Sequence, residues 1–138
     1  MALSLLNRAE VLVALGRAAE ARRDVAAAER GFQTLGAHFD AADVYRVLAL
    51  CDRAQGLPGQ AEARLLQARE LAKMTGARLT EAEAARDLGR LYAETGRVKD
   101  AHSALREALE TFEALGATAD AEATEREMAQ LRAAEGVH

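Results

Sequence analysis

The spacing of glycine constrains the fold of this chain more than any other feature of its sequence. Glycine reaches the left-handed backbone conformation that ends many helices at little steric cost. The segments between the regularly spaced glycines are rich in helix-forming residues, and the single proline falls where the first turn of a new helix tolerates it. The spacing therefore predicts a helix end every 20 residues, at Gly16, Gly36, Gly56, Gly76, Gly96, Gly116 and Gly136.

The sequence repeats with a period of 40 residues, so each unit should hold two helices. When units 1–40, 41–80 and 81–120 are aligned, small residues coincide, and Ala9, Ala49, Gly89 and Ala129 should let paired helices approach closely. Repeats of this length indicate a solenoid of stacked helix pairs. We expect an all-α fold with one domain, 1–138, that ends in a capping helix, 121–138. Its helices should span about 2–15, 18–35, 40–55, 58–75, 79–95, 98–115 and 119–134.

The composition narrows the classes of partner and location. The formal net charge of −4 argues against nucleic acid or a membrane surface as the main partner. No apolar run approaches the ~20 residues of a membrane span. The N-terminus lacks the basic start of a signal peptide, so we expect a cytoplasmic protein. The excess of arginine over lysine, with abundant alanine, hints at a bacterial source. The lone Cys51 shares its repeat position with Val11, Leu91 and Leu131 and should lie in the core.

The sequence offers no convincing catalytic or metal-binding pattern. The three histidines, His38, His102 and His138, are widely separated. His102 precedes Ser103, but adjacent residues on a helix point about 100° apart and cannot form a nucleophile–base pair. The common zinc, phosphate-loop and serine-hydrolase motifs do not occur. We therefore predict a protein that is not an enzyme and that has no cofactor and no metal.

The third unit resembles the tetratricopeptide repeat, whose motif is W-x2-L-G-x2-Y-x3-G-x4-A-x3-F-x2-A. Residues at the motif's spacing are Leu88, Gly89, Tyr92, Gly96, Ala101 and Ala108. The first unit departs with Arg8 at the leucine site, and the second departs with Asp52 at the tyrosine site. The long period is similar to that of kinesin light chains and of bacterial signalling proteins and transcriptional activators. The resemblance implies a right-handed superhelix that binds partner proteins in a concave groove lined by the first helix of each pair.

Arginines recur on the helices that the resemblance assigns to this groove. Arg46, Arg86 and Arg126 are 40 residues apart, and Arg53 and Arg90 lie on the same face. Guanidinium groups suit carboxylates and phosphates, so one interpretation is a groove that selects an acidic peptide. The alternative is a charge-balanced wall that keeps the groove soluble, because acidic residues precede the arginines by three or four positions: Asp43, Glu83, Asp87 and Glu122.

The first helix is apolar on nearly every side. Leu3, Leu6 and Val13 occupy repeat positions that hold charged residues in later units, and Val11 and Leu15 are apolar as well. A helix of this kind is normally buried, and large exposed apolar patches usually mark interaction sites. We expect helix 2–15 to pack against its copy in a homodimer or against a domain outside this chain. The alternative is an edge that tolerates three exposed apolar side chains.

Three functions follow from these features. The leading one is a non-enzymatic protein-interaction scaffold that binds a peptide or partner protein through its groove. The second is a self-assembling structural module whose own edges form the binding surface. The third is a regulatory segment of a larger bacterial signalling or transcription protein.

Overall fold

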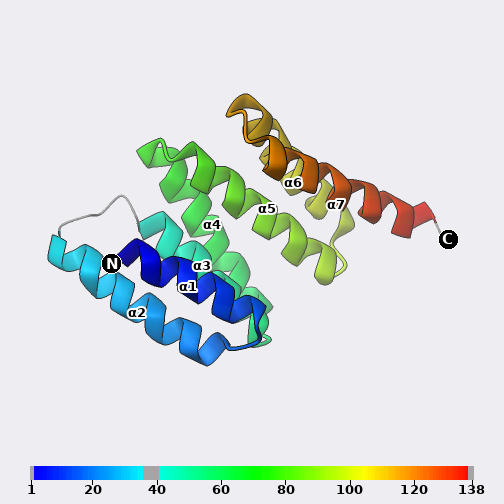
Figure 1. Ribbon diagram of the computed structural model, residues 1–138. Coiled ribbons are helices and arrows are strands. Elements are labelled where there is room, and N and C mark those ends of the chain that lie inside the picture. Colours follow the sequence, from blue (N-terminus) through cyan, green and yellow to red (C-terminus); the bar gives the residue numbers. More distant parts are fainter. Residues whose placement is uncertain (1, 36–40, 137–138) are drawn as a thin grey trace.

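The computed structural model describes residues 2–35 and 41–136, and these ranges form seven helices and no strand (Figure 1). All seven helix bounds lie within two residues of those expected from the sequence, which confirms the all-α architecture. The helices are α1 (Ala2–Ala14), α2 (Ala18–Leu35), α3 (Ala41–Ala54), α4 (Pro58–Thr75), α5 (Arg78–Glu94), α6 (Val98–Ala114) and α7 (Thr118–Gly136).

The periodic glycines end helices by adopting the left-handed conformation. Gly56 and Gly96 have φ angles of 76° and 80°, and the three other glycines of the series with positive φ are Gly16, Gly76 and Gly116. After Gly96, the amide of Arg97 donates a hydrogen bond of 2.8 Å to the carbonyl of Tyr92, which closes the last turn of α5. Gly136 is the last residue of α7, and Gly36 lies outside the described residues.

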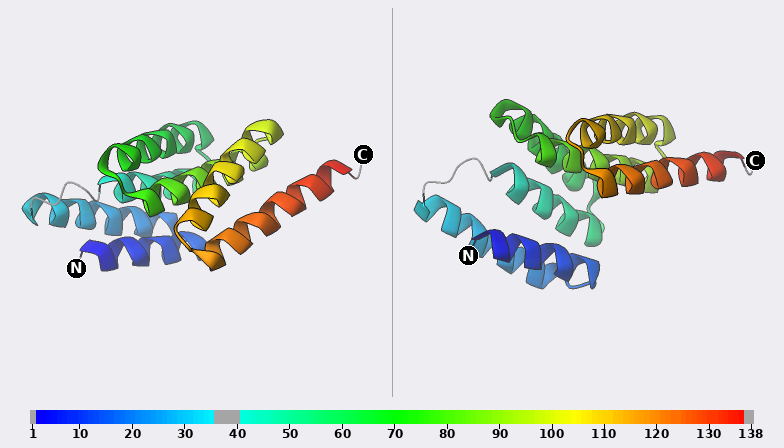
Figure 2. Two further views of the ribbon diagram at one scale, coloured as in Figure 1. Left: turned by 90° about the horizontal axis from the view of Figure 1, so that it is seen from above. Right: turned by 45° about the horizontal axis from the view of Figure 1, so that its top comes forward.

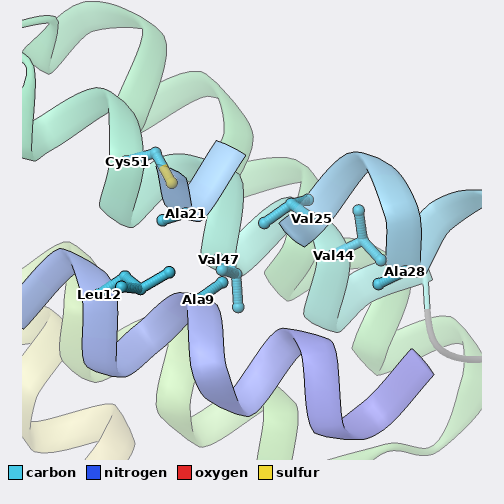
Figure 3. Close-up of a cluster of buried hydrophobic side chains, with 8 residues drawn as sticks. All are labelled: Ala9, Leu12, Ala21, Val25, Ala28, Val44, Val47 and Cys51. Carbon is cyan, nitrogen blue, oxygen red and sulfur yellow. The ribbon is translucent and has the colours of Figure 1, made fainter. Parts of the chain in front are cut away.

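Consecutive helices pack against each other along the whole described chain. The first helices of the units are α1, α3, α5 and α7, and the second helices are α2, α4 and α6. Figures 1 and 2 show the pairs stacked in succession, with α1 and α7 at opposite ends of the array. Buried side chains of α1, α2 and α3 form the first core cluster, which includes Val25, Val47 and Cys51 (Figure 3).

Cys51 is fully buried, as expected from its repeat position. Burial raises the pKa of its thiol above the ordinary value. The thiol is therefore held in its protonated form and acts as a small apolar side chain of the core.

Gly89 occupies the closest approach between α5 and α6. A Cβ atom at this position would lie 2.6 Å from Cγ of Leu105 and 3.3 Å from the carbonyl oxygen of Ala101. The sequence-based expectation that this site requires a small residue is therefore supported by the local geometry.

Candidate functional site

Arg46 is buried at the centre of the wall formed by the first helices. Only 4% of its side chain is exposed, and it forms ion pairs with Glu10 of α1, with Asp43 at 3.1 Å and with Asp87 of α5 at 3.2 Å. Burial alone would lower the pKa of Arg46, but the surrounding carboxylates outweigh that effect and raise it. The expectation that Arg46 stands exposed in a groove therefore does not hold, because α1 and α5 supply carboxylates that cover it on both sides.

The other predicted groove arginines differ in exposure. Arg86 is largely covered, lies 3.6 Å from Asp120, and stacks over the Phe112 ring at 5.9 Å. Arg53 and Arg90 keep about two-fifths of their side chains exposed (40% and 38%). Arg126 is exposed and makes no ion pair with the part of the chain that the structure describes.

Arg53 and Arg90 are each clamped by a glutamate on the first helix of the following unit. Arg53 donates two hydrogen bonds to Glu94 of α5, one of them 2.8 Å long. Arg90 donates to both carboxylate oxygens of Glu127 of α7, at 2.9 and 3.1 Å. Forked contacts of this kind are the strong form of the arginine–carboxylate pair.

These ion pairs join successive units rather than neighbouring turns of one helix. The sequence suggested pairs three or four residues apart, and two of them form, Asp43–Arg46 and Asp87–Arg90 at 3.7 Å. Most of the remaining contacts of the wall run from one first helix to the next. The sequence did not predict the partners Glu10, Glu94 and Glu127. Opposite charges about one repeat apart were the signal that could have identified these pairs. The contacts favour a charge-balanced wall around Arg46 and Arg86.

Glu83 lies among the charges around Arg46, and its ionised form destabilises the fold. Burial raises the pKa of the Glu83 carboxyl, and the nearby carboxylates Asp43 and Glu10 act in the same direction. Arg46 and Arg86 lower the pKa of Glu83 but do not cancel the increase. The folded state therefore holds an ionised Glu83 less favourably than the unfolded chain does.

This shift predicts that Glu83→Gln stabilises the fold at neutral pH. A raised carboxyl pKa in the fold lowers stability above that pKa, and the penalty vanishes below the unfolded value of about 4.3. Thermal unfolding at pH 7 should give a higher Tm for the variant, and the difference should shrink towards pH 4. Glu110→Gln, at an exposed site on α6, serves as the control. A less stable Glu83→Gln variant at pH 7 would show that attraction to the arginines outweighs burial.

The two charged departures from the tetratricopeptide motif form ion pairs that join first helices to second helices. Arg8 reaches Asp24 of α2 with two hydrogen bonds of 2.8 and 3.2 Å, which join α1 to α2. Asp52 is fully buried and pairs with Arg22 of α2 and with Arg64 of α4 at 3.4 Å. The charges at these two sites therefore hold helices together inside the array.

A cleft of about 360 Å³ lies between α5 and α7 and has α6 at its base. Its floor is apolar and is formed by Gly89, Ala93, Leu105, Leu131 and Ala134. Its rim carries the two clamped pairs, Arg53–Glu94 and Arg90–Glu127. The structure thus brings two of the predicted groove arginines to one apolar recess, which Arg46, Arg86 and Arg126 do not line.

The predicted self-association edge differs in detail from the structure. Val13 is partly buried and packs against the first core cluster, because its side of α1 faces the other helices of that cluster. Val13 is therefore less available to an exposed edge than the sequence suggested, and the self-association edge stays a prediction. Leu3 and Leu6 lie on α1, but their side chains fall outside the described ones. The large apolar side chains that the structure exposes in this region are Val11 and Leu15, at 58% and 65%.

The architecture and the site define a class of protein, a solenoid of antiparallel helix pairs whose first helices form a charged wall beside an apolar cleft. A family model for the tetratricopeptide repeat matches residues 1–74 and 40–114. The chain belongs to the tetratricopeptide repeat family, whose repeats generally mediate protein–protein interaction. No curated protein matches the chain.

The described residues contain neither a metal-binding cluster nor a membrane-spanning helix. In residues 2–35 and 41–136 no group of three or more His, Cys, Asp and Glu side chains is placed to hold a metal ion. No helix in those ranges is long and apolar enough to cross a membrane.

Proposed function

We propose that the chain is a non-enzymatic interaction module that holds a segment of a partner protein on the face formed by α3, α5 and α7. The observation that carries this proposal is the cleft between α5 and α7. Its apolar floor can desolvate a side chain of the partner, and the charged rim can orient the backbone or polar groups beside it. A cytoplasmic location and a bacterial source remain part of the same proposal.

Fewer of the predicted arginines can bind a partner than the sequence suggested. Arg46 and Arg86 are covered and already surrounded by carboxylates, so their role lies inside the array. Arg53 and Arg90 can offer an acidic partner only the donors that Glu94 and Glu127 leave available. Arg126 does not line the cleft, but it is exposed and makes no ion pair within the described residues, so its guanidinium is available to a partner's carboxylate beside the cleft.

Photo-cross-linking from within the cleft tests this function. Gln130 lines the cleft and is exposed, so a benzophenone amino acid at that position should capture whatever occupies the cleft in cells that produce the chain. Gln67, exposed on α4, is the matched control position. The proposal predicts cross-linked protein from position 130 and little from position 67. Equal labelling from both positions, or labelling from position 67 alone, would contradict it. Adding Arg126→Glu should reduce the yield if the partner is acidic.

A further inference from the structure

The 40-residue repeat places one apolar side chain in each joint, meaning the contact between a unit and the first helix of the next. Cys51 of α3 closes the first joint within the cluster that holds Ala9 and Val25. Leu91 of α5 closes the second joint within the cluster that holds Ala49 and Leu65. All six residues are at most 3% exposed. The chain itself therefore shows that this kind of recess is filled by a small or medium apolar side chain delivered from a helix.

The third joint contains the same set of positions, is closed at the start of α7 by Ala121, and is open around Leu131. Gly89 and Leu105 are buried, whereas Leu131 of α7 is only partly buried, and the cleft of about 360 Å³ lies between them. The two ends of this part of α7 are attached by Arg90–Glu127 and by a contact of 3.2 Å between His102 and Glu135. Figure 2 shows α7 leading away from the other helices towards the C-terminus. The third joint therefore has room for an additional apolar side chain.

The first unit exposes the same repeat position at the other end of the array. Val11 stands one repeat before Cys51, two before Leu91 and three before Leu131, yet it is 58% exposed. Leu15, one turn further along, is 65% exposed. The side chain that fills joints elsewhere in this protein is thus presented to the outside by the first unit, while the last joint stays open.

We propose that Val11 and Leu15 of one copy of the chain insert into the cleft between α5 and α7 of a second copy. This inference rests on the proposed function and names the partner. Arg8, one turn before Val11, is paired with Asp24 within the chain but keeps 67% of its side chain exposed. The proposed contact brings this positive charge towards a rim that carries Glu94, which is paired with Arg53 and is 45% exposed. The two surfaces differ, so the contact is head-to-tail and each pair keeps one free edge and one free cleft.

Sedimentation equilibrium with two matched glutamate variants tests the head-to-tail contact. Val11→Glu alters the edge, and Ala134→Glu alters the apolar lining of the cleft at an exposed position. Wild-type chain should exceed the monomer mass of 14.8 kDa increasingly with concentration. Each variant alone should remain a monomer, while an equal mixture should form a 1:1 dimer that grows no further, because one intact edge meets one intact cleft. Ala133→Glu, on α7 but outside the cleft lining, should assemble as the wild type does.

The outcomes separate this inference from the alternatives. A wild-type chain that stays monomeric at high micromolar concentration overturns it, and so does a mixture of variants that stays monomeric. If Val11→Glu is monomeric while Ala134→Glu still dimerises, the contact is between two α1 edges and the inference is wrong. Cross-linking from position 130 to a different protein, with a monomeric wild type, would retain the proposed function and reject the second copy as its partner.

Discussion

Replacing Arg46 by leucine is expected to lower the free energy of unfolding by about 3–5 kcal/mol. The substitution removes the guanidinium that pairs with Asp87, whose side chain is 2% exposed, and leaves that carboxylate without its partner across the α3–α5 joint. Glu10 and Asp43 lose the same partner. Removing one member of a buried ion pair is costly because the other charge loses compensation, and Asp87 then keeps only Arg86 at 3.4 Å and Arg90 at 3.7 Å, both on its own helix. Urea denaturation of wild type and variant measures the difference.

Two comparisons define what the Arg46 result means. Arg126→Leu, in the same repeat position but exposed, should change stability by no more than about 0.5 kcal/mol. The double variant Arg46→Leu with Asp87→Leu should be more stable than Arg46→Leu alone, because it also removes the buried carboxylate that has lost its partner on α3. A loss below about 1 kcal/mol for Arg46→Leu would show that solvent reaches the ion pairs around Arg46 and that these pairs do not stabilise the wall.

Replacing Gly89 by leucine is expected to cost about 1–3 kcal/mol through overpacking. The Cβ atom alone would lie 2.6 and 2.7 Å from Cγ and Cδ2 of Leu105, so α5 and α6 must separate or Leu105 must leave its place. Leu105 is 2% exposed, which leaves it little room to move. Thermal or urea unfolding of the purified variant provides the measurement.

Gly59→Ala is the matched control for Gly89. No heavy atom lies within 4 Å of a Cβ built at Gly59, and its φ angle is not positive, so alanine there should leave stability unchanged or raise it. A Gly89→Leu variant as stable as the wild type would mean that the two helices are not in close contact at this site.

The helices were predictable because their ends are marked locally. Gly56 and Gly96 terminate helices through their own backbone conformation, which depends on the residue itself and the preceding turn. The core position of Cys51 followed from its repeat position, because the neighbouring units on both sides are present in the chain. The repeat period and the residue types were enough to predict the helix ends and the core position of Cys51.

The exposure of the repeated arginines could not be read from the period. Arg46, Arg86 and Arg126 share a repeat position, yet side-chain exposure rises from 4% at Arg46 to 14% at Arg86, and Arg126 is exposed. Arg46 has carboxylate partners on α1 and on α5, whereas Arg126 lies on the terminal helix. A period shows which residues face a neighbouring unit, but burial depends on the packing of the helices that supply the partners.

The same reason explains which side chains of the first helix, α1, are exposed. Val11 shares the repeat position of Cys51 and Leu91, but α1 has a neighbouring unit on only one side in the structure, so Val11 is exposed. Val13 stands where the second unit has Arg53, and the sequence therefore suggested an exposed patch there. In the structure it packs against the first core cluster. The apolar character of this helix was predictable, whereas the side that remains uncovered was not.

Amide hydrogen exchange of the wild-type chain at low and high concentration tests most directly the claim that the open third joint receives a partner chain. Local opening lowers protection where few apolar contacts hold a segment, so residues 127–134 of α7 should exchange faster than α5 in the dilute protein. At high concentration, protection should rise together in residues 11–15 and 127–134, with little change in α4. Protection that does not depend on concentration in either segment, or that rises in residues 11–15 alone, would contradict this account.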